Sequence, residues 1–392
     1  MQTLLLRPLP SAPTHSWTNA EPESDSLVEI SELNVTPERL FDLQLQHDAL
    51  RAETIYPIIS KAVARNRPRA TGRTGFSSSI IFGLTQGSRE YFTRLGVGTP
   101  LRYLYMVLDT GSDVVWVQCS PCKNCYSQSD PIFYPTKTRS FSGIPCGSPL
   151  CCSLDSSGCN KRRICIYQVS YDDGSVTFGD FSTETLMFRR TKLECVALGY
   201  GHDNEGLFVG ATGLLSLGRG RLSFPTQAGR RFNRKFYYCL VDRSAFSKSS
   251  SMIFGDTAIS RTTVFTPLLT NPKLDTFYCV ELLGISVGGT CVREITPSLF
   301  KMDPAGNGGV IIDSGTKTSV KVPTVVLHFR GANVSLLATN YLIPVDSSGT
   351  FCYAFAGTMS GLSIIGNIQQ QSFRVAFDSA GSQIGFAPRG CA

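Results

Sequence analysis

Two short stretches of this chain share one pattern: Val107-Leu108-Asp109-Thr110-Gly111-Ser112 and Ile311-Ile312-Asp313-Ser314-Gly315-Thr316. Each is an apolar run followed by an aspartate, a hydroxyl residue, a glycine and a second hydroxyl residue. An apolar-apolar-glycine element comes after each of them, at Leu214-Leu215-Ser216-Leu217-Gly218 and at Ile364-Ile365-Gly366. The sequence therefore contains a weak internal repeat built around two aspartates.

The repeated pattern has a chemical meaning. A strand that ends in Asp and then turns through Gly projects a carboxylate from the end of a sheet, because Gly adopts backbone conformations that a side chain would penalise. Flanking hydroxyl groups can fix the orientation of that carboxylate by hydrogen bonds. If the two units face each other, Asp109 and Asp313 share one proton and titrate as a pair. One carboxyl group is then a general base for a bound water, and the other a general acid towards a carbonyl oxygen.

The rest of the chain has a β texture from Tyr91 onward. Short β-branched and aromatic runs are cut by Gly, Pro, Asn and Ser at intervals of about eight to twelve residues, which is typical of a mostly-β protein. Residues 2–32 are rich in Pro, Ser and acids, and we expect them to be disordered. A helix is predicted from Thr36, its N-cap, to Tyr56.

Composition limits the class of function. Hydrophobic residues make up 42% of the 392 residues, so wholesale disorder is excluded. The net charge is +7, but the cations are scattered among turns without a nucleic-acid-binding motif, so no nucleic-acid partner is expected. No run approaches the roughly 18 apolar residues of a spanning helix, so no integral membrane segment is expected.

Several separated motifs together resemble one family. They are the two Asp units, both apolar-glycine elements, Tyr171-Asp172-Asp173-Gly174-Ser175 and Gly385-Phe386-Ala387. In this order they resemble the pepsin-like aspartic proteases (peptidase family A1), and most closely the plant branch similar to nepenthesin. The resemblance covers roughly Tyr91 to Cys391.

The resemblance implies a mostly β, bilobal pepsin-like fold, in which two β-barrel-like lobes flank a cleft. Residues 1–90 would be propeptide-like, residues 91–260 the N-terminal lobe with a cysteine-rich insertion, and residues 261–392 the C-terminal lobe. Asp109 and Asp313 would be the catalytic dyad, and Tyr171 the tyrosine of the flap over the cleft. The residues that support the two active-site loops would be Thr110, Gly111, Ser112, Ser314, Gly315 and Thr316.

By the same likeness, the chain would be an aspartic endopeptidase made as a zymogen and active at acidic pH. Its partner would be a polypeptide substrate, and it would work as a monomer without cofactor or metal. The alternatives are a non-catalytic binding protein on the same scaffold, like the plant xylanase inhibitors, and an inactive shortened product.

All 14 cysteines lie at or after Cys119. The two-residue spacing of Cys119, Cys122 and Cys125 is compatible with zinc, but the surrounding turns and the lack of a nearby His in the sequence favour disulfides. Disulfides point to an oxidising compartment, so we expect a secreted, extracellular or cell-wall protein. The only apolar run at the N-terminus, Leu4-Leu5-Leu6, is too short for a secretory signal, and we expect the true start to be missing.

The resemblance also predicts how some cysteines pair. Cys239 and Cys391 would form the link between the start and the end of the C-terminal lobe. Relatives have Cys where this chain has Tyr200. Conversely, they seldom have a cysteine at the positions of Cys195, Cys279 and Cys291. We therefore expect unpaired thiols at these three positions.

The second half of the repeat is short. Gly218 lies 109 positions after Asp109, whereas Gly366 lies only 53 positions after Asp313. Relatives continue after the second Asp unit through a long segment with a helix, further strands and a cysteine. Here residues 317–321 run straight into the next strand, as if a segment had been deleted. We expect the loss to uncover core residues of the C-terminal lobe and to leave Cys352 without its partner.

Overall fold

The computed structural model of the chain describes residues 75–83, 88, 90–171, 174–206, 208, 210–241, 250–256, 262–273, 275–313, 323–344, 351–355 and 362–388. The predicted disordered segment and helix before residue 75 lie outside these ranges. So do Ser314, Gly315 and Thr316, the junction at residues 317–321, and Cys391.

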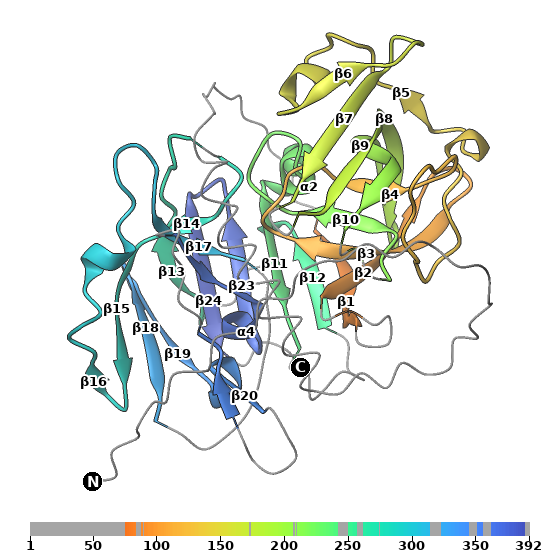
Figure 1. The fold of residues 1–392 in the computed structure, drawn as a ribbon. Coiled ribbons are helices and arrows are strands. Elements are labelled where there is room, and N and C mark those ends of the chain that lie inside the picture. Colours follow the sequence, from red (N-terminus) through yellow and green to blue (C-terminus); the bar gives the residue numbers. More distant parts are fainter. Residues whose placement is uncertain are drawn as a thin grey trace, which may run out of the picture. The chain divides into compact units, whose positions relative to one another are not determined.

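Up to residue 256 the regular secondary structure of the described chain consists mainly of strands (Figure 1). These strands are β1 (Phe76–Phe82), β2 (Tyr91–Val97), β3 (Arg102–Asp109), β4 (Trp116–Gln118), β5 (Ser142–Gly143), β6 (Ser157–Cys159), β7 (Cys165–Ser170), β8 (Val176–Phe188), β9 (Thr191–Glu205), β10 (Gly213–Ser216), β11 (Lys235–Cys239) and β12 (Ser250–Phe254).

Strands also dominate from residue 262 onward, and the helices of the described chain are single short turns. The later strands are β13 (Val264–Pro267), β14 (Cys279–Val280), β15 (Leu282–Val287), β16 (Thr290–Cys291), β17 (Gly309–Ile312), β18 (Val325–Phe329), β19 (Ala332–Leu336), β20 (Leu342–Pro344), β21 (Phe351–Tyr353), β22 (Leu362–Ile365), β23 (Phe373–Asp378) and β24 (Gln383–Pro388). The helices are α2 (Phe224–Gln227), α3 (Gly229–Phe232), α4 (Asn367–Gln370) and the 3-10 turns η2 (Pro135–Lys137), η3 (Cys151–Ser153), η6 (Pro297–Phe300) and η7 (Ala338–Asn340). The prediction of a mostly-β protein is confirmed.

The largest sheet joins strands from both ends of the chain. Its order is β13-β24-β23-β11-β12-β1-β2-β3-β10-β4-β9-β8-β7-β6, with β5 paired to β8. The remaining strands form the sheets β14-β17-β22, β16-β15-β18-β19 and β20-β21. Strands such as β1 and β19 alternate between buried and more exposed residues, as expected for strands with one face against the core.

The internal repeat reappears as a repeated strand pairing. β3, which ends at Asp109, runs parallel to β10, so that Ser216 pairs with Asp109. β17 ends one residue before Asp313 and runs parallel to β22, so that Ile312 pairs with Ile365. Each apolar-glycine element therefore lies beside the strand that delivers its aspartate.

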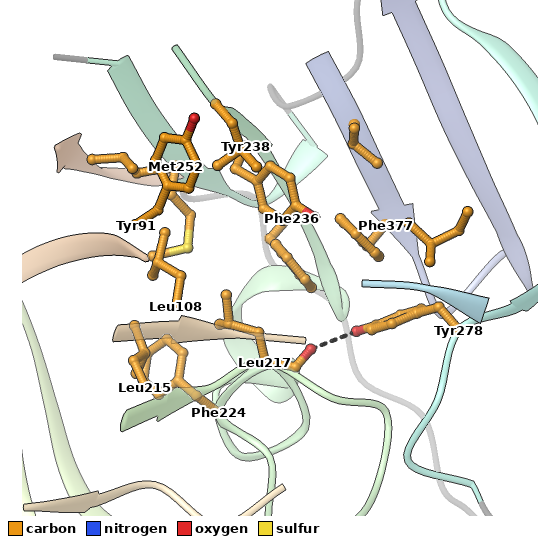
Figure 2. Packing of buried hydrophobic residues seen from close by; sticks show 14 of the residues in the cluster. Tyr91, Leu108, Leu215, Leu217, Phe224, Phe236, Tyr238, Met252, Tyr278 and Phe377 are labelled. Atoms are coloured by element: carbon orange, nitrogen blue, oxygen red, sulfur yellow. Dashed lines mark hydrogen bonds between the residues drawn. The ribbon is translucent and has the colours of Figure 1, made fainter. Parts of the chain in front are cut away.

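The main core is continuous between the two halves of the chain. Its members range from Ile80 on β1 to Phe377 on β23, and both are buried. Figure 2 shows Phe236 next to Phe377, with ring centroids 4.6 Å apart, and Tyr278 reaching across to Leu217. The Tyr278 hydroxyl donates a hydrogen bond to the Leu217 carbonyl at 2.8 Å.

β1 is an internal strand of the largest sheet, although it belongs to the segment predicted to be propeptide-like. It pairs with β12 on one side and with β2 on the other. Its residue Phe76 stacks on Phe254 with centroids 4.6 Å apart. Residues 76–82 are thus part of the folded sheet.

Three disulfides confirm the preference for disulfides over zinc: Cys122–Cys125, Cys146–Cys159 and Cys151–Cys165. Cys239 is also disulfide-bonded, in line with its predicted role, and its predicted partner lies outside the described residues. The predicted unpaired thiols are confirmed as free at Cys195, Cys279, Cys291 and Cys352. Cys119 and Cys152 are free as well.

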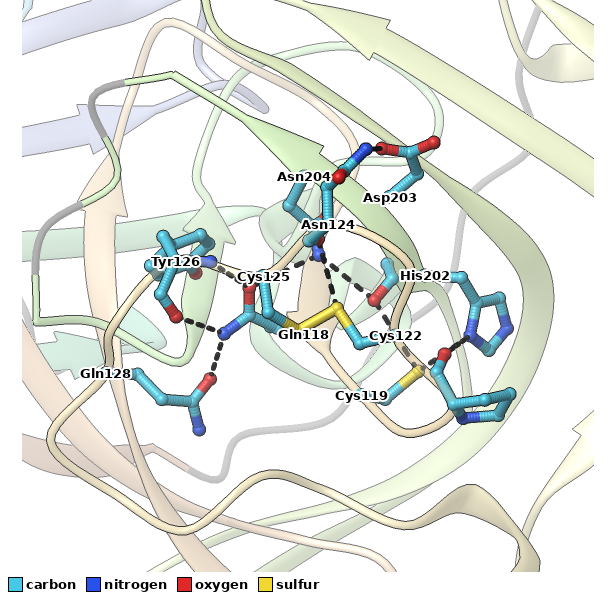
Figure 3. Close-up of a disulfide and its surroundings, with 12 residues drawn as sticks. Gln118, Cys119, Cys122, Asn124, Cys125, Tyr126, Gln128, His202, Asp203 and Asn204 are labelled. Carbon is cyan, nitrogen blue, oxygen red and sulfur yellow. Dashed lines mark hydrogen bonds between the residues drawn. A yellow bond between two sulfur atoms is a disulfide. The ribbon is translucent and has the colours of Figure 1, made fainter. Parts of the chain in front are cut away.

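Cys119, one of these free thiols, lies beside His202 (Figure 3). The Cys119 Sγ is 3.5 Å from His202 Nδ1. The same nitrogen lies 2.7 Å from the Pro121 carbonyl, and Nε2 lies 3.4 Å from an Asp180 carboxylate oxygen. An imidazolium satisfies both acceptors at once. Burial alone would lower the pKa of His202, but Asp180 and Cys119 raise it to about 10.

Candidate active site

Asp109 is held at the end of β3 by backbone groups on both sides. Its side chain accepts a hydrogen bond from the Gly111 N–H at 2.9 Å, which is the tight turn expected of the motif. Its carbonyl accepts the Leu217 N–H at 2.6 Å, from the turn that follows β10. The residue is buried, with 7% of its surface exposed. The aspartate is thus fixed by its own turn and by the apolar-glycine element.

Asp313 is held in a corresponding way after β17. Its N–H donates to the Ile365 carbonyl at 2.9 Å. The Gln370 amide on α4 donates to the Asp313 carbonyl and, at 2.9 Å, to the Ile365 carbonyl. Gln370 in turn accepts the Tyr238 hydroxyl at 2.5 Å. Neither Gln370 nor Tyr238 was predicted from the sequence, since both act through contacts with distant segments.

Thr110 joins the two aspartate loops directly. Its hydroxyl donates to Asp313 Oδ1 at 3.0 Å, across 203 positions of sequence, and the Thr110 side chain is buried. The structure therefore brings the loop of Asp109 into contact with Asp313. On the other side of the first loop, Ser112 and Ser216 are hydrogen-bonded at 2.8 Å, and the Ser216 hydroxyl donates to the Val114 carbonyl.

Tyr171 follows β7 and lies near the first aspartate. Its hydroxyl accepts a hydrogen bond from the Trp116 indole N–H at 2.6 Å. Its ring meets Phe208 edge-on with centroids 5.6 Å apart. Burial raises the pKa of Tyr171 well above its usual value, and the charge of Asp109 raises it further. Tyr171 therefore stays a neutral hydroxyl beside the Asp109 carboxyl group.

Trp116, Phe208 and Tyr126 complete an aromatic wall next to Tyr171. Phe208 lies 4.9 Å from Trp116 and 5.3 Å from Tyr126, centroid to centroid. The Tyr126 hydroxyl is buried, and it has no hydrogen-bond partner among the described residues. Trp116 could have been singled out from the sequence, because it is one of only two tryptophans and lies seven positions after Asp109.

Two further features are absent from the described residues. In these ranges no group of three or more His, Cys, Asp or Glu side chains is arranged to hold a metal ion. Nor does any helix within them have the length and apolar character needed to span a membrane. The chemistry of the described site is that of carboxyl groups, hydroxyl groups and aromatic rings.

Comparison with protein-family models gives two matches. Residues 91–256 match the model described as "Xylanase inhibitor N-terminal", and residues 316–388 match "Xylanase inhibitor C-terminal". Among solved structures, the chain is similar to edgp with a TM-score of 0.64 at 18% identity, covering 82% of this chain and 96% of that one. It is also similar to soybean basic 7S globulin, with a TM-score of 0.62 at 16% identity over 81% and 97%. These structural likenesses concern the fold.

Curated relatives are considerably more similar in sequence. Aspartyl protease family protein 2 of Arabidopsis thaliana is 61% identical over 92% of this chain and 83% of its own length. Aspartic proteinase nepenthesin-1 of Nepenthes gracilis is 33% identical over 97% and 95%. Together with the paired aspartate loops, these similarities show that the chain belongs to the plant pepsin-like aspartic proteases of peptidase family A1.

Proposed function

We propose that this protein is an aspartic endopeptidase in which Asp109 and Asp313 activate a water for attack on a peptide carbonyl. One carboxyl group takes a proton from the water while the other gives a proton to the carbonyl oxygen, so no covalent enzyme intermediate forms. A pair that shares one proton works in acid, because both carboxyl groups ionise as the pH rises. An extended polypeptide is the substrate, with Tyr171 closing over it.

The observation that carries the proposal is the hydrogen bond from Thr110 to Asp313. It fixes the loop of one aspartate against the side chain of the other, which supports the proposal that the two carboxyl groups lie close enough to share a proton. Gly111, Ser112 and Ser216 hold the first loop from its other side. We extend the same supporting role to Ser314, Gly315 and Thr316, whose sequence repeats that of the first loop.

The test compares the processed chain with Asp109→Ala and Asp313→Ala on a denatured protein at about pH 3–4. The matched control is Asp303→Asn, because Asp303 is an exposed carboxylate that contacts Asn307. We expect both dyad variants to lose at least about a thousandfold in kcat and the control to keep its activity. Equal activity of the wild type and either dyad variant would rule out the assignment.

The propeptide, in this proposal, ends before Phe76. Removing residues up to 90 would take β1 out from between β12 and β2 and leave two unpaired strand edges. Cleavage in the basic stretch between Lys61 and Gly75 leaves the sheet complete. N-terminal sequencing of the activated protein would locate the cut. We place the enzyme in an oxidising, extracellular or cell-wall compartment because of its disulfides, and expect it to be monomeric.

We also propose that the C-terminal lobe is shortened. The alignment with the 61% identical relative extends over 401 residues but covers only 92% of this chain, which is about 361 residues. About 40 positions of that relative therefore have no counterpart here. A deletion close to residues 317–321 agrees with this difference.

The family description favours a second candidate, a binding protein that inhibits a glycoside hydrolase. Both matching models are described by xylanase inhibitors. Binding of a statine-type peptide inhibitor separates the two functions, because such a compound occupies an intact aspartate dyad. A chain that inhibits a xylanase and does not bind the statine compound would be the binding protein.

A further inference from the structure

Asp113 is a half-buried residue just beyond the Asp109 motif, and the proposed mechanism does not use its carboxyl group. One of its oxygens accepts the Gly220 N–H at 2.9 Å, and the other accepts the Thr276 hydroxyl at 2.7 Å. A Cβ atom added to Gly220 would lie 1.8 Å from Asp113 Oδ2, and one added to Gly218 would lie 2.3 Å from Oδ1. The turn after β10 is therefore packed directly onto this carboxyl group.

The contacts of Asp113 lead from one aspartate loop to the other. Thr276 belongs to the segment that enters β14, and its carbonyl accepts the Arg219 N–H at 2.9 Å. Two residues later, the Tyr278 carbonyl accepts the Ile312 N–H at 3.1 Å, immediately before Asp313. The Tyr278 hydroxyl donates back to the Leu217 carbonyl, as Figure 2 shows. Asp113 thus connects the Asp109 loop to the backbone that supports Asp313.

The charges around Asp113 favour its neutral form. Burial is the largest cause that raises the pKa of Asp113, to about 7, while the hydrogen bonds from Thr276 and Gly220 lower it and the charges of Asp275 and Asp155 raise it further. On the same segments, the Arg219 guanidinium donates to the carbonyls of Leu269 and Phe277. The folded state therefore binds a proton at Asp113 that the unfolded chain releases between about pH 4 and 7.

The partner of Asp113 suits both protonation states. A hydroxyl group can donate to a carboxylate and can accept from a carboxylic acid. The Asp113–Thr276 hydrogen bond consequently persists in acid, where a carboxylate–ammonium pair would lose its charge. Above neutral pH both hydrogen bonds are made to a carboxylate, and the folded state then carries a desolvated charge next to two other acids, which costs it free energy.

We propose that Asp113 is a positioning residue of the Asp109–Asp313 site: its carboxyl group holds the segment leading to β17 against the Asp109 loop, and the folded state that contains this contact is more stable in acid. The inference rests on the proposed function, since it concerns the geometry of that dyad. Acid would then favour the enzyme for a second reason, separate from the titration of the dyad itself: the folded state that carries the Asp113 contact is more stable in acid.

The test uses the full chain with two substitutions and a control. Asp113→Asn imitates the neutral acid, because its carbonyl can accept the Gly220 N–H and its amide can donate to Thr276. Asp113→Ala leaves both of those groups unpaired. The control is Asp378→Asn, a buried carboxyl group that pairs instead with the Lys235 ammonium. The quantities measured are kcat and KM across the acid range and the unfolding equilibrium from about pH 4 to 7.

For activity, we expect Asp113→Asn to keep kcat within about threefold of the wild type at about pH 4. Asp113→Ala should lose at least about tenfold in kcat with little change in KM, because misplacing catalytic groups slows the chemical step. If the Ala variant does not fold, Thr276→Val removes the same hydrogen bond and should also lower kcat. Wild-type kcat in the folded variant of this pair would overturn the proposal.

For stability, unfolding is measured in the Asp109→Ala background so that self-digestion does not interfere. One such carboxyl group weakens the folded state by up to about tenfold per pH unit between its unfolded and folded pKa values. Asp113→Asn should remove this pH-dependent part of the unfolding free energy, and Asp378→Asn should retain it. An unchanged pH slope in Asp113→Asn would overturn the proposal even if the dyad assignment held. Conversely, full activity of Asp109→Ala would overturn the assigned function and leave the stability result to stand alone.

Discussion

Thr110 links the loop that carries Asp109 to the side chain of Asp313. Its buried hydroxyl donates to Asp313 Oδ1 at 3.0 Å. We expect Thr110→Val to destabilise the fold by about 1–3 kcal/mol, because a buried acceptor loses its donor. It should also lower kcat by about 10–100-fold through misplacement of the pair. Thr110→Ser keeps the hydroxyl and is the matched control, so equal kcat values for the Val and Ser variants would contradict the role.

His202 provides a second prediction, on pH-dependent stability. Its pKa in the folded protein is about 10, above the unfolded value of about 6.5. The contribution of His202 to folding stability is therefore complete below about pH 6.5 and disappears as the pH rises through about 10. We expect His202→Gln to lower the free energy of unfolding by about 1–2 kcal/mol at about pH 5, and by progressively less towards about pH 10.

The control for that prediction is His328→Gln. His328 contacts Ser286 and Asn333 and pairs with no carboxylate in the described residues. Urea unfolding of both variants at several pH values gives the comparison. A His202→Gln effect that does not change with pH would contradict the charged pair with Asp180.

Which site residues the sequence could predict depends on how local their signal is. Asp109 and Asp313 could be proposed from the sequence because each carries its turn within three residues, and Tyr171 because it stands in a recognisable motif; their roles stay predictions. The dependence of Asp113 on Thr276 spans 163 positions, and that of Tyr238 on Gln370 spans 132. No local pattern encodes such partners, since folding alone brings them together.

At the scale of elements, the sequence predicted strands but not their order. Alternation of apolar and polar residues identifies a strand, because side chains alternate between the two faces of a sheet. It does not tell which strand lies beside it. Thus the mostly-β class was predicted, whereas the pairing of β11 with β23, or of β1 with β12, follows only from the structure.

The cysteine-rich insertion offers a test with its own internal control. Cys151–Cys165 closes a loop over 14 positions, and both residues are buried. The double substitution Cys151→Ala and Cys165→Ala should cost about 2–4 kcal/mol of unfolding free energy. The neighbouring Cys152 is free and exposed, so Cys152→Ala should change stability by less than about 0.5 kcal/mol. Thermal unfolding measures both, and an equal loss in the two proteins would show that the disulfide is not what stabilises the insertion.

At the scale of the whole molecule, the large apolar side chains that remain exposed are unevenly distributed. Among the described residues, four of them precede residue 261: Tyr103, Tyr134, Leu150 and Phe178. Seven follow it: Val264, Leu283, Val287, Leu299, Leu337, Tyr353 and Phe355. The later region is also the shorter one, so its surface is the more apolar. Exposed apolar side chains of this kind are expected where a covering segment has been lost.

Restoring that segment is the corresponding experiment. Inserting the counterpart from the 61% identical relative between Thr316 and Lys321 should cover part of this surface, and each large side chain covered contributes up to about 1.5–3 kcal/mol. We therefore expect the restored chain to gain at least about 2 kcal/mol in unfolding free energy. Its binding of a hydrophobic dye should fall, and kcat should rise if the position of Asp313 depends on the lobe. The matched control carries a Gly/Ser segment of equal length, which adds chain without apolar contacts. If both insertions gave the same stability and dye binding, the exposed side chains would not be the footprint of a missing segment.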